Sequence, residues 1–303
     1  MNRQKKALVL FSGGLDSILA VKLLQGQKIK IKALIFKSYF WETDQAEKAA
    51  KRLKIPYQVI DFSVEHLALV KKPPHGYGKA ANPCVDCHTL MLKQTKKIMA
   101  KKGFDFVATG EVLGERPFSQ NKKALSLVAK ESGLKDRLLR PLSAKVLPPT
   151  LPEKKGWVKR EKLMAIQGRS RQQQIALAKK LKIKEYPQPA GGCLLCEKEF
   201  GKKLFKLLEK WPECNGNDIG LLRLGRHFWE GKTLIVLGKN HEENLKLAKL
   251  AQKKDILLKP QNFPGPTALI RNSKINQKKI KTAQKLILKL SSKASKQPQF
   301  VVE

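Results

Sequence analysis

The sequence predicts an α/β fold, in which a parallel sheet carries helices on both faces, followed by a smaller C-terminal α+β domain. Short apolar runs alternate with amphipathic stretches through the first half of the chain, and a glycine-rich turn follows the first run. Beyond residue 200 this alternation gives way to short strands and separate helices. Strands that alternate with helices are typical of parallel sheets. We expect one domain over 1–199 and a second over 200–303.

The apolar runs define the expected strands of the first domain, at 7–11, 33–36, 57–62 and 104–109. Helical periodicity predicts helices over 15–25, 43–53 and 85–101, and the first ends at Gly26. Residues 144–156 contain three prolines and are expected to form a linker or surface loop, with helices following at 159–167 and 169–182.

The expected second domain contains helices at 200–210 and 242–252 and strands at 233–237, 256–258 and 267–270. From Arg271 onward there are nine basic residues and one acid, Glu303. This tail predicts either a basic amphipathic helix or a solvated end.

The charge of the chain indicates a polyanionic partner. In 303 residues, 62 Lys and Arg face 25 Asp and Glu, a net charge of +37. RNA or DNA is the first candidate for such an excess. Lysine enrichment of a heat-adapted surface is the alternative, although heat adaptation increases the numbers of both basic and acidic residues. The sequence has no apolar run of 18 residues and opens directly on an expected strand, so we expect a cytoplasmic protein without membrane contact.

The segment Ser12–Ser17, with sequence SGGLDS, joins the first expected strand to the first helix. Glycines allow the backbone to approach a phosphate, and the N–H groups of the turn and helix N-terminus then face the anion. Asp16 would repel bare phosphate but suits a Mg²⁺ ion bound to phosphates. No lysine follows the glycines, which excludes the common P-loop. Ligands of parallel sheets bind beyond the carboxyl ends of the strands. We expect the segment 71–87 and the pair Thr109–Gly110 to lie at the same edge of the sheet as the Ser12–Ser17 loop.

SGGLDS resembles the pyrophosphate loop of N-type ATP pyrophosphatases, which have an adenine nucleotide alpha hydrolase-like fold. These enzymes cleave ATP between its α and β phosphates and adenylate a substrate oxygen. The resemblance implies that Mg-ATP is bound by Ser12, Gly13, Gly14, Asp16 and Ser17. It also implies nucleotide contacts from Leu10, Phe36, Thr109 and Gly110.

Two CxxC pairs, Cys84 with Cys87 and Cys193 with Cys196, indicate metal or redox chemistry rather than a disulfide framework. Four thiolates can close a zinc site, and three can hold a [4Fe–4S] cluster with one iron open. A persulfide on one cysteine, resolved by another, needs no metal.

The string NPCVDC at Asn82–Cys87 resembles the tRNA 2-thiouridylases, as do Ala108–Gly110 and the LRPL string at 139–142. The stretch from Gly168 to Cys193 is similar to a thiouridylase-like group. In the 2-thiouridylases an acidic residue occupies the position that corresponds to Cys84. The catalytic cysteine of those enzymes corresponds to Cys87. A CxxC with a remote cysteine instead resembles the iron–sulfur-dependent tRNA thiolases. That resemblance implies Cys84, Cys87 and Cys193 as cluster ligands, with Cys196 less certain as a fourth.

The resemblance implies ATP-dependent tRNA uridine thiolation, with Asp16 and the three cysteines Cys84, Cys87 and Cys193 as catalytic residues. The sulfur donor would be sulfide or a persulfide carrier. The resemblance leaves open whether the chain forms a homodimer. An amidotransferase or ligase with structural Zn²⁺ is one alternative, and a non-catalytic ATP- and RNA-binding protein is another.

Basic residues indicate where RNA would bind. From 121 to 190, 18 Lys or Arg face five acids, and Arg169 and Arg171 lie near the expected cluster ligand. Arg226 lies in a C-terminal region that weakly resembles an RNA-binding module of ribosome quality-control proteins. His88 is interpreted as a polar helix residue, a ligand or a base, and Cys214 as structural.

Overall fold

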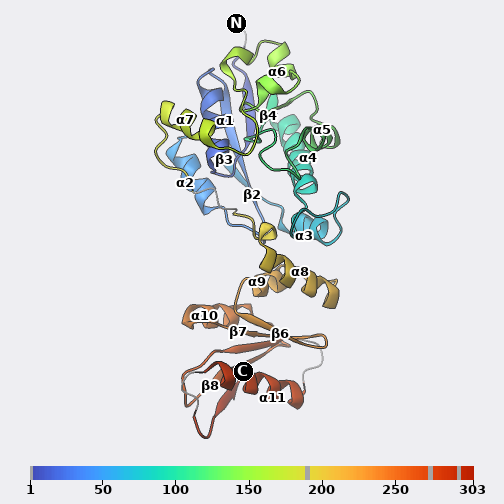
Figure 1. Cartoon of the computed structure of the whole chain (residues 1–303), viewed down its shortest axis with the longest axis vertical. Helices are drawn as coiled ribbons and strands as arrows, with labels where there is room; N and C mark the ends of the chain where they lie inside the picture. The colour runs from blue at the N-terminus through green and yellow to red at the C-terminus, as the bar shows by residue number, and fades with distance from the viewer. Residues whose placement is uncertain (1–2, 188–191, 272–275, 292–294) are drawn as a thin grey trace. The chain divides into compact units, whose positions relative to one another are not determined.

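The computed structural model describes residues 3–187, 192–271, 276–291 and 295–303 (Figure 1). The chain divides into two compact units, Met1–Leu194 and Leu195–Glu303. The division thus falls five residues before the end of the domain expected over 1–199, and it separates Cys193 from Cys196. The expected segment 189–191 before Cys193 lies outside the described residues.

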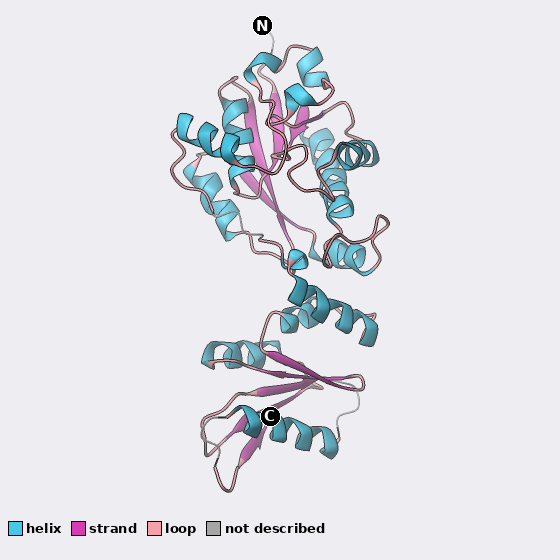
Figure 2. Ribbon diagram, in the orientation of Figure 1, coloured by secondary structure: helices cyan, strands magenta, loops and turns pink. Residues whose placement is uncertain are grey.

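The N-terminal unit is built on a five-stranded parallel sheet, which confirms the predicted fold class. Its strands lie in the order β3-β2-β1-β4-β5, and each neighbouring pair is parallel (Figure 2). The strands are β1 (Lys6–Leu10), β2 (Lys30–Lys37), β3 (Tyr57–Asp61), β4 (Phe106–Ala108) and β5 (Leu138–Leu139). Because β1 is central, the turn that follows it lies in the middle of the sheet's carboxyl edge.

Helices cover both faces of this sheet. Side chains alternate along a strand, so Ala7 and Val9 of β1 enter one core while Leu8 enters the other. The first core contains α1 (Leu15–Gln25) and α2 (Asp44–Arg52), and the second contains α4 (Cys84–Lys102) and α5 (Lys122–Glu131). A third cluster packs α7 (Gln172–Lys180) against α1 through Leu15, Leu19 and Ala178.

Several elements differ from those predicted. A helix at 159–167 was expected, but the structure has only the 3-10 turn η2 (Arg160–Lys162) there. The expected loop at 144–156 contains the 3-10 turn η1 (Ala144–Val146) and the short helix α6 (Leu151–Lys154). Its prolines are compatible with α6 because Pro152 occupies the first turn, where a missing N–H costs nothing. The helix α3 (Ser63–Lys71), which was not predicted, separates β3 from the segment 71–87.

The C-terminal unit is α+β, as expected, with an antiparallel sheet in the order β10-β8-β9-β7-β6. The strands are β6 (Arg226–Glu230), β7 (Thr233–Leu237), β8 (Ile256–Pro260), β9 (Ala268–Arg271) and β10 (Phe300–Val302). The helices are α8 (Lys198–Lys210), α9 (Gly216–Leu222), α10 (His241–Leu250) and α11 (Gln277–Leu290). Within the basic tail, α11 is an amphipathic helix whose Ala283 and Ile287 are buried against the sheet.

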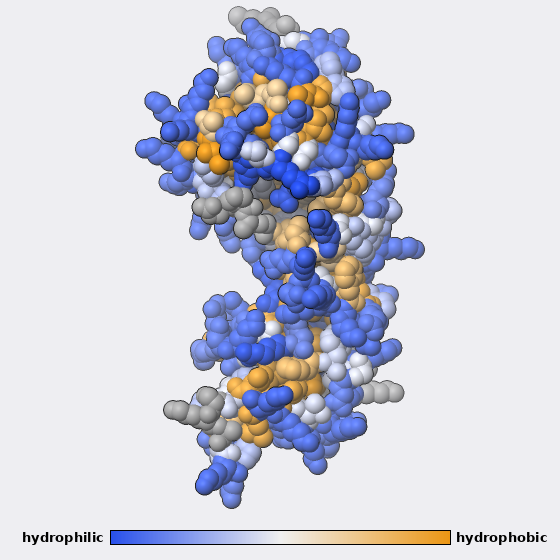
Figure 3. Space-filling model, in the orientation of Figure 1, coloured by the Kyte–Doolittle hydropathy of each residue, from blue (hydrophilic) through white to orange (hydrophobic). Residues whose placement is uncertain are grey.

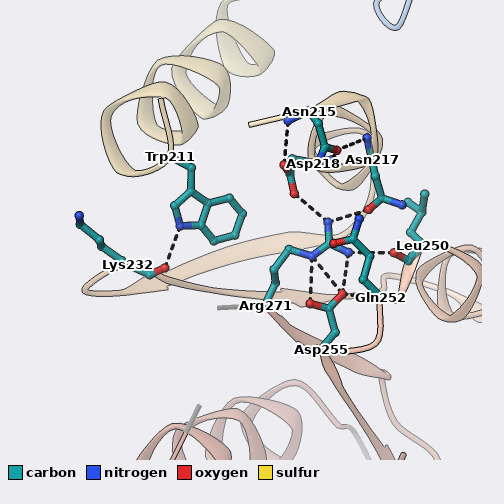
Figure 4. A network of polar contacts seen from close by, with 9 residues as sticks. All are labelled: Trp211, Asn215, Asn217, Asp218, Lys232, Leu250, Gln252, Asp255 and Arg271. Carbon is teal, nitrogen blue, oxygen red and sulfur yellow. Dashed lines mark hydrogen bonds and ion pairs between the residues drawn. The ribbon is translucent and has the colours of Figure 1, made fainter. Parts of the chain in front are cut away.

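A buried arginine joins several elements of the C-terminal unit (Figure 4). Arg271 donates hydrogen bonds from Nε and Nη2 to the Asp255 carboxylate, the shortest at 2.6 Å. Its Nη1 donates to Asp218 Oδ1 at 2.8 Å, and its Nη2 donates to the Leu250 carbonyl at 2.8 Å. With all its donors directed to acceptors, this guanidinium is a structural link between β9, α9 and the end of α10.

Polar side chains are prominent on the face drawn in Figure 3, where hydrophilic residues cover most of each unit. None of the helices in the described ranges has the length and apolar character required to cross a membrane.

Candidate functional site

Hydrogen bonds within the turn after β1 hold its two serines against the backbone of Gly14. The Gly14 N–H donates to Ser12 Oγ at 3.3 Å, and Ser17 Oγ donates to the Gly14 carbonyl at 2.8 Å. Ser17 is buried while Ser12 is exposed. α1 starts at Leu15, so the positive end of its dipole lies at the turn.

Two glycines of this region have no room for a side chain. Gly13 has φ of +74°, and a Cβ there would lie 2.7 Å from the Ala46 Cα. A Cβ on Gly110, which follows β4, would lie 2.6 Å from the backbone of Asp16 and Ser17. The Thr109–Gly110 segment therefore packs directly against the loop, as the sequence predicts for two strand ends at one edge of a sheet.

Asp16 is partly buried beside basic and acidic neighbours. Its Oδ2 lies 3.6 Å from Arg171 Nη2, and Arg171 Nε lies 3.8 Å from Glu115 Oε1. Burial raises the pKa of Asp16, and the Arg171 charge opposes this rise. Burial and then the Asp16 charge raise the pKa of Glu115. Arg171, which is expected to contact RNA, thus lies beside Asp16 of the loop.

Glu111 is the centre of a buried polar cluster that sequence reasoning missed. Arg140 Nε donates to Glu111 Oε2 at 2.8 Å, and Thr109 Oγ1 donates to the same oxygen at 2.9 Å. The other oxygen lies 2.7 Å from His88 Nδ1. Burial alone would raise the pKa of Glu111, but Arg140 and His88 outweigh it and lower that pKa strongly. Burial opposes protonation of His88, but Glu111 outweighs it and raises the pKa of His88.

The first turn of α4 carries Cys84 and Cys87. The Asn82 amide Nδ2 donates to Cys84 Sγ at 3.2 Å. Cys87 is buried in the same core as Phe36. Asp86, between the two cysteines, accepts a hydrogen bond from the His75 N–H and lies 2.6 Å from the His75 ring, which ties the preceding loop to the helix.

Cys193 lies in a separate segment of the N-terminal unit. The next residue, Leu194, donates its N–H to the Phe40 carbonyl at 3.0 Å, just beyond the carboxyl end of β2. Among the described residues, which include every cysteine of the chain, no three Cys, His, Asp or Glu side chains gather closely enough to hold a metal ion. The described residues thus show no group that matches the [4Fe–4S] ligand set expected from Cys84, Cys87 and Cys193.

The remaining predicted residues have varied surroundings. Leu10 is half-buried, whereas Phe36 is buried and meets Phe62 edge to face, with ring centroids 5.2 Å apart. Arg169 and Arg226 are exposed. His227 lies on β6, where its Nε2 is 3.1 Å from the Leu221 carbonyl and burial lowers its pKa to about 4. Cys214 is buried in the C-terminal unit.

Comparisons with known proteins agree with this geometry. The model of the tRNA methyl transferase HUP domain family matches residues 5–144, which contain the whole parallel sheet, the loop and both α4 cysteines. Residues 5–144 are therefore similar to HUP domains. Further along the chain, residues 225–303 match the model of the NFACT protein RNA binding domain. The weak resemblance of the C-terminal region to an RNA-binding module is thereby confirmed.

Curated relatives match about a third of this chain. The tRNA-specific 2-thiouridylase MnmA of Sulfurimonas denitrificans is 34% identical over 119 residues, covering 36% of this chain and 35% of the relative. That of Thermus thermophilus is 27% identical over 135 residues, covering 35% of this chain and 36% of the relative. The chain thus spans about a third of the length of these relatives.

Two solved structures share a more distant likeness. One is a 4-thiouridine synthetase–RNA complex with bound ATP, at 18% identity and a TM-score of 0.38, covering 59% of this chain and 52% of that one. The other is a predicted subunit of tRNA methyltransferase from Methanocaldococcus jannaschii, at 20% identity and a TM-score of 0.35, covering 46% and 67%.

Proposed function

We propose that this chain is an ATP-dependent tRNA thiolase that adenylates a uridine carbonyl oxygen and then replaces that oxygen with sulfur. One observation carries the proposal. The three residues Thr109–Glu111 contact the nucleotide loop at one end, through Gly110, and the cysteine-bearing helix at the other, through Glu111 and His88. An activated carbon formed at the loop would therefore lie in the same region of the sheet edge as the α4 thiols. The 2-thiouridylase relatives support this reading.

The first step forms the adenylate. The uridine carbonyl oxygen attacks the α-phosphorus of ATP, the bond to the β-phosphate breaks, and pyrophosphate leaves. Ser12, Ser17 and the N–H groups of the turn would bind the departing phosphates, where fixed donors are most effective. Asp16 fits a Mg²⁺ ion, since its Oδ1 is buried without a hydrogen-bond partner among the described residues. The ion would neutralise charge on the phosphates.

The second step transfers sulfur. A hydrosulfide attacks the adenylated carbon, AMP leaves, and one proton is lost, which balances atoms and electrons without an oxidant. With sulfide as the donor, this attack is direct and forms no bond to a cysteine. With a persulfide carrier as the donor, Cys87 would take the outer sulfur by exchange, which releases the carrier's thiol, and this terminal sulfur would attack the carbon in place of hydrosulfide. Cys84 would then attack the inner sulfur, which releases the thiouridine, leaves a Cys84–Cys87 disulfide and consumes a thiol reductant. No step here depends on an iron–sulfur cluster, because the described cysteines are not gathered to hold one.

The proposed partner is tRNA. The RNA binding domain match at 225–303 and the overall charge of +37 support it. A uridine inside folded tRNA must leave its stack before its carbonyl can reach the loop.

The test is a thiolation assay with unmodified tRNA, Mg-ATP, a persulfidated carrier protein as the sulfur donor, and a thiol reductant. We expect pyrophosphate release together with thiouridine in the digested tRNA. Asp16→Ala should abolish both, whereas Cys87→Ser should lose thiouridine and retain pyrophosphate release. Cys214→Ala, which removes a thiol from the other unit, is the matched control and should change neither by more than about twofold.

Three outcomes would contradict the proposal. Pyrophosphate release without sulfur transfer, with zinc in the protein, would indicate a ligase or amidotransferase. Binding of tRNA without pyrophosphate release would indicate a non-catalytic RNA-binding protein. Retained thiolation in Asp16→Ala would remove the loop from the mechanism. Iron and sulfide analysis of anaerobically purified protein decides whether a cluster assembles on Cys84, Cys87 and Cys193.

A further inference from the structure

The first turn of α7 places two polar side chains at the nucleotide loop. α7 is packed on α1, the helix that begins at the loop, and Arg171 is its N-cap residue. The Arg171 guanidinium lies between Asp16 and Glu115, at N···O distances of 3.6 and 3.8 Å. Gln174 follows three residues later, one helical turn along on the same side.

Arg171 differs from the structural arginines of the same protein. Arg140 and Arg271 are each 7% exposed and donate to carboxylates at 2.6–2.8 Å, the normal length of a charge-assisted hydrogen bond. Arg171 is 21% exposed, and its distances to both carboxylates exceed that length by about 1 Å. Its charge is attracted to the two acids, but its N–H groups are not committed to them. Arg171 Nε has no hydrogen-bond partner among the described residues.

Gln174 provides an independent observation. Its side chain is fully buried, and within the described ranges neither its amide oxygen nor its amide nitrogen has a hydrogen-bond partner. The amide faces Asp16 closely enough to lower the pKa of that carboxyl, although it does not reach hydrogen-bond geometry. A buried amide without partners is unfavourable, so its position beside an anion-binding loop points to a ligand that supplies the missing contacts.

The local charges indicate the chemistry of that ligand. Asp16 and Glu115 place two carboxylates beside the loop, and without basic residues they would repel a phosphate chain. Arg171 offsets one of these charges and retains N–H groups for phosphate oxygens. A planar guanidinium is well suited to phosphate because it offers several donors in a fixed arrangement.

We propose that Arg171 and Gln174 are phosphate-binding residues that hold the β- and γ-phosphates of the nucleotide at the Ser12–Ser17 loop. This inference rests on the proposed function, because it requires that the loop bind ATP. It assigns the Gly168–Leu181 region to the nucleotide rather than to RNA. The two residues would bind the phosphates in different ways: Arg171 contributes charge, and Gln174 contributes neutral hydrogen bonds.

The test is calorimetric titration of the full chain with Mg·α,β-methylene-ATP, which cannot be cleaved between those phosphates, and with AMP. Arg171→Ala should weaken binding of the triphosphate analogue by about 10- to 100-fold, the range for a lost hydrogen bond to a charged group. Binding of AMP should change by less than about threefold, because AMP lacks the β- and γ-phosphates. Arg171→Lys should restore part of the loss, since it keeps the charge. Gln174→Met should cost about 3- to 10-fold for the analogue only.

Lys179→Ala is the matched control, since Lys179 is an exposed cation on the same helix α7, and it should bind the analogue like the unmodified protein. Thermal unfolding of each variant checks that the fold persists, and Arg171→Lys serves where Arg171→Ala does not fold. The inference is overturned if Arg171→Ala binds the analogue normally, or if AMP loses affinity equally. It is also overturned if only tRNA affinity falls, which would return Arg171 to RNA. Failure of the unmodified chain to bind the analogue would instead contradict the proposed function itself.

Discussion

Replacing Arg140 by methionine tests whether the buried cluster around Glu111 holds the N-terminal unit together. The Arg140 and Glu111 side chains are 7% and 4% exposed, and their Nε and Oε2 atoms lie 2.8 Å apart. Methionine fills similar space but leaves the carboxylate with only Thr109 and His88. Removing one partner of a buried ion pair costs about 3–5 kcal/mol, because the remaining charge is desolvated. At about 2–4 °C per kcal/mol for a unit of this size, its melting temperature should fall by about 6–20 °C.

Differential scanning calorimetry of the full chain measures this change, since the two units can unfold in separate transitions. Arg137→Met is the control, because Arg137 is exposed and donates only to a backbone carbonyl, so a shift of at most about 2 °C is expected. The double variant Arg140→Met/Glu111→Gln should regain part of the loss, since it removes the unpaired charge. Equal melting temperatures for Arg140→Met and Arg137→Met would refute the reasoning.

Two further predictions concern pH and RNA. Burial lowers the pKa of His66 from 6.5 to about 4, so the unfolded chain binds an extra proton between these values. The N-terminal unit should therefore lose about 3 kcal/mol of stability from this group as pH falls from 6.5 to 4, and denaturation of His66→Gln should show a shallower pH dependence. If the stability of His66→Gln changed with pH as steeply as that of the unmodified protein, the prediction would be wrong. In the C-terminal unit, alanine substitution of the exposed α11 lysines should lower the salt dependence of tRNA binding by about 0.7–0.9 in logarithmic slope per lost phosphate contact. These lysines are Lys278, Lys281, Lys285 and Lys289. Alanine at Lys202 and Lys206, which already pair with glutamates, is the control, and equal slopes for both sets would exclude α11 as an RNA contact.

The sequence was sufficient for the parts of the fold that depend on local pattern. The first strand, the glycine turn and the first helix follow from apolar periodicity and the conformational freedom of Gly13, and the structure has all three. Apolar periodicity was insufficient where helices are short. The prolines at 148, 149 and 152 predicted a loop where α6 forms, and residues 159–167 have helical composition but form only η2.

The site was harder to predict because its key contacts join residues far apart in the chain. Arg171 lies 155 positions after Asp16, and only the packing of α7 on α1 brings them together. Glu111 follows Thr109–Gly110 directly, so an acid immediately after a glycine that was expected to contact the nucleotide was the available signal. The cysteine ligand set came from resemblance rather than from the residues themselves, and the described part of the chain does not assemble it.

The contact of Gly110 with the loop has a consequence for how chain length can vary in this protein. One extra residue between Thr109 and Glu111 would displace either the glycine from the Asp16 backbone or the carboxylate from Arg140. The connection between α3 and α4 can lengthen at its exposed positions without moving either contact. Insertions are therefore expected in that connection, whereas the spacing from Thr109 to Glu111 is expected to stay fixed.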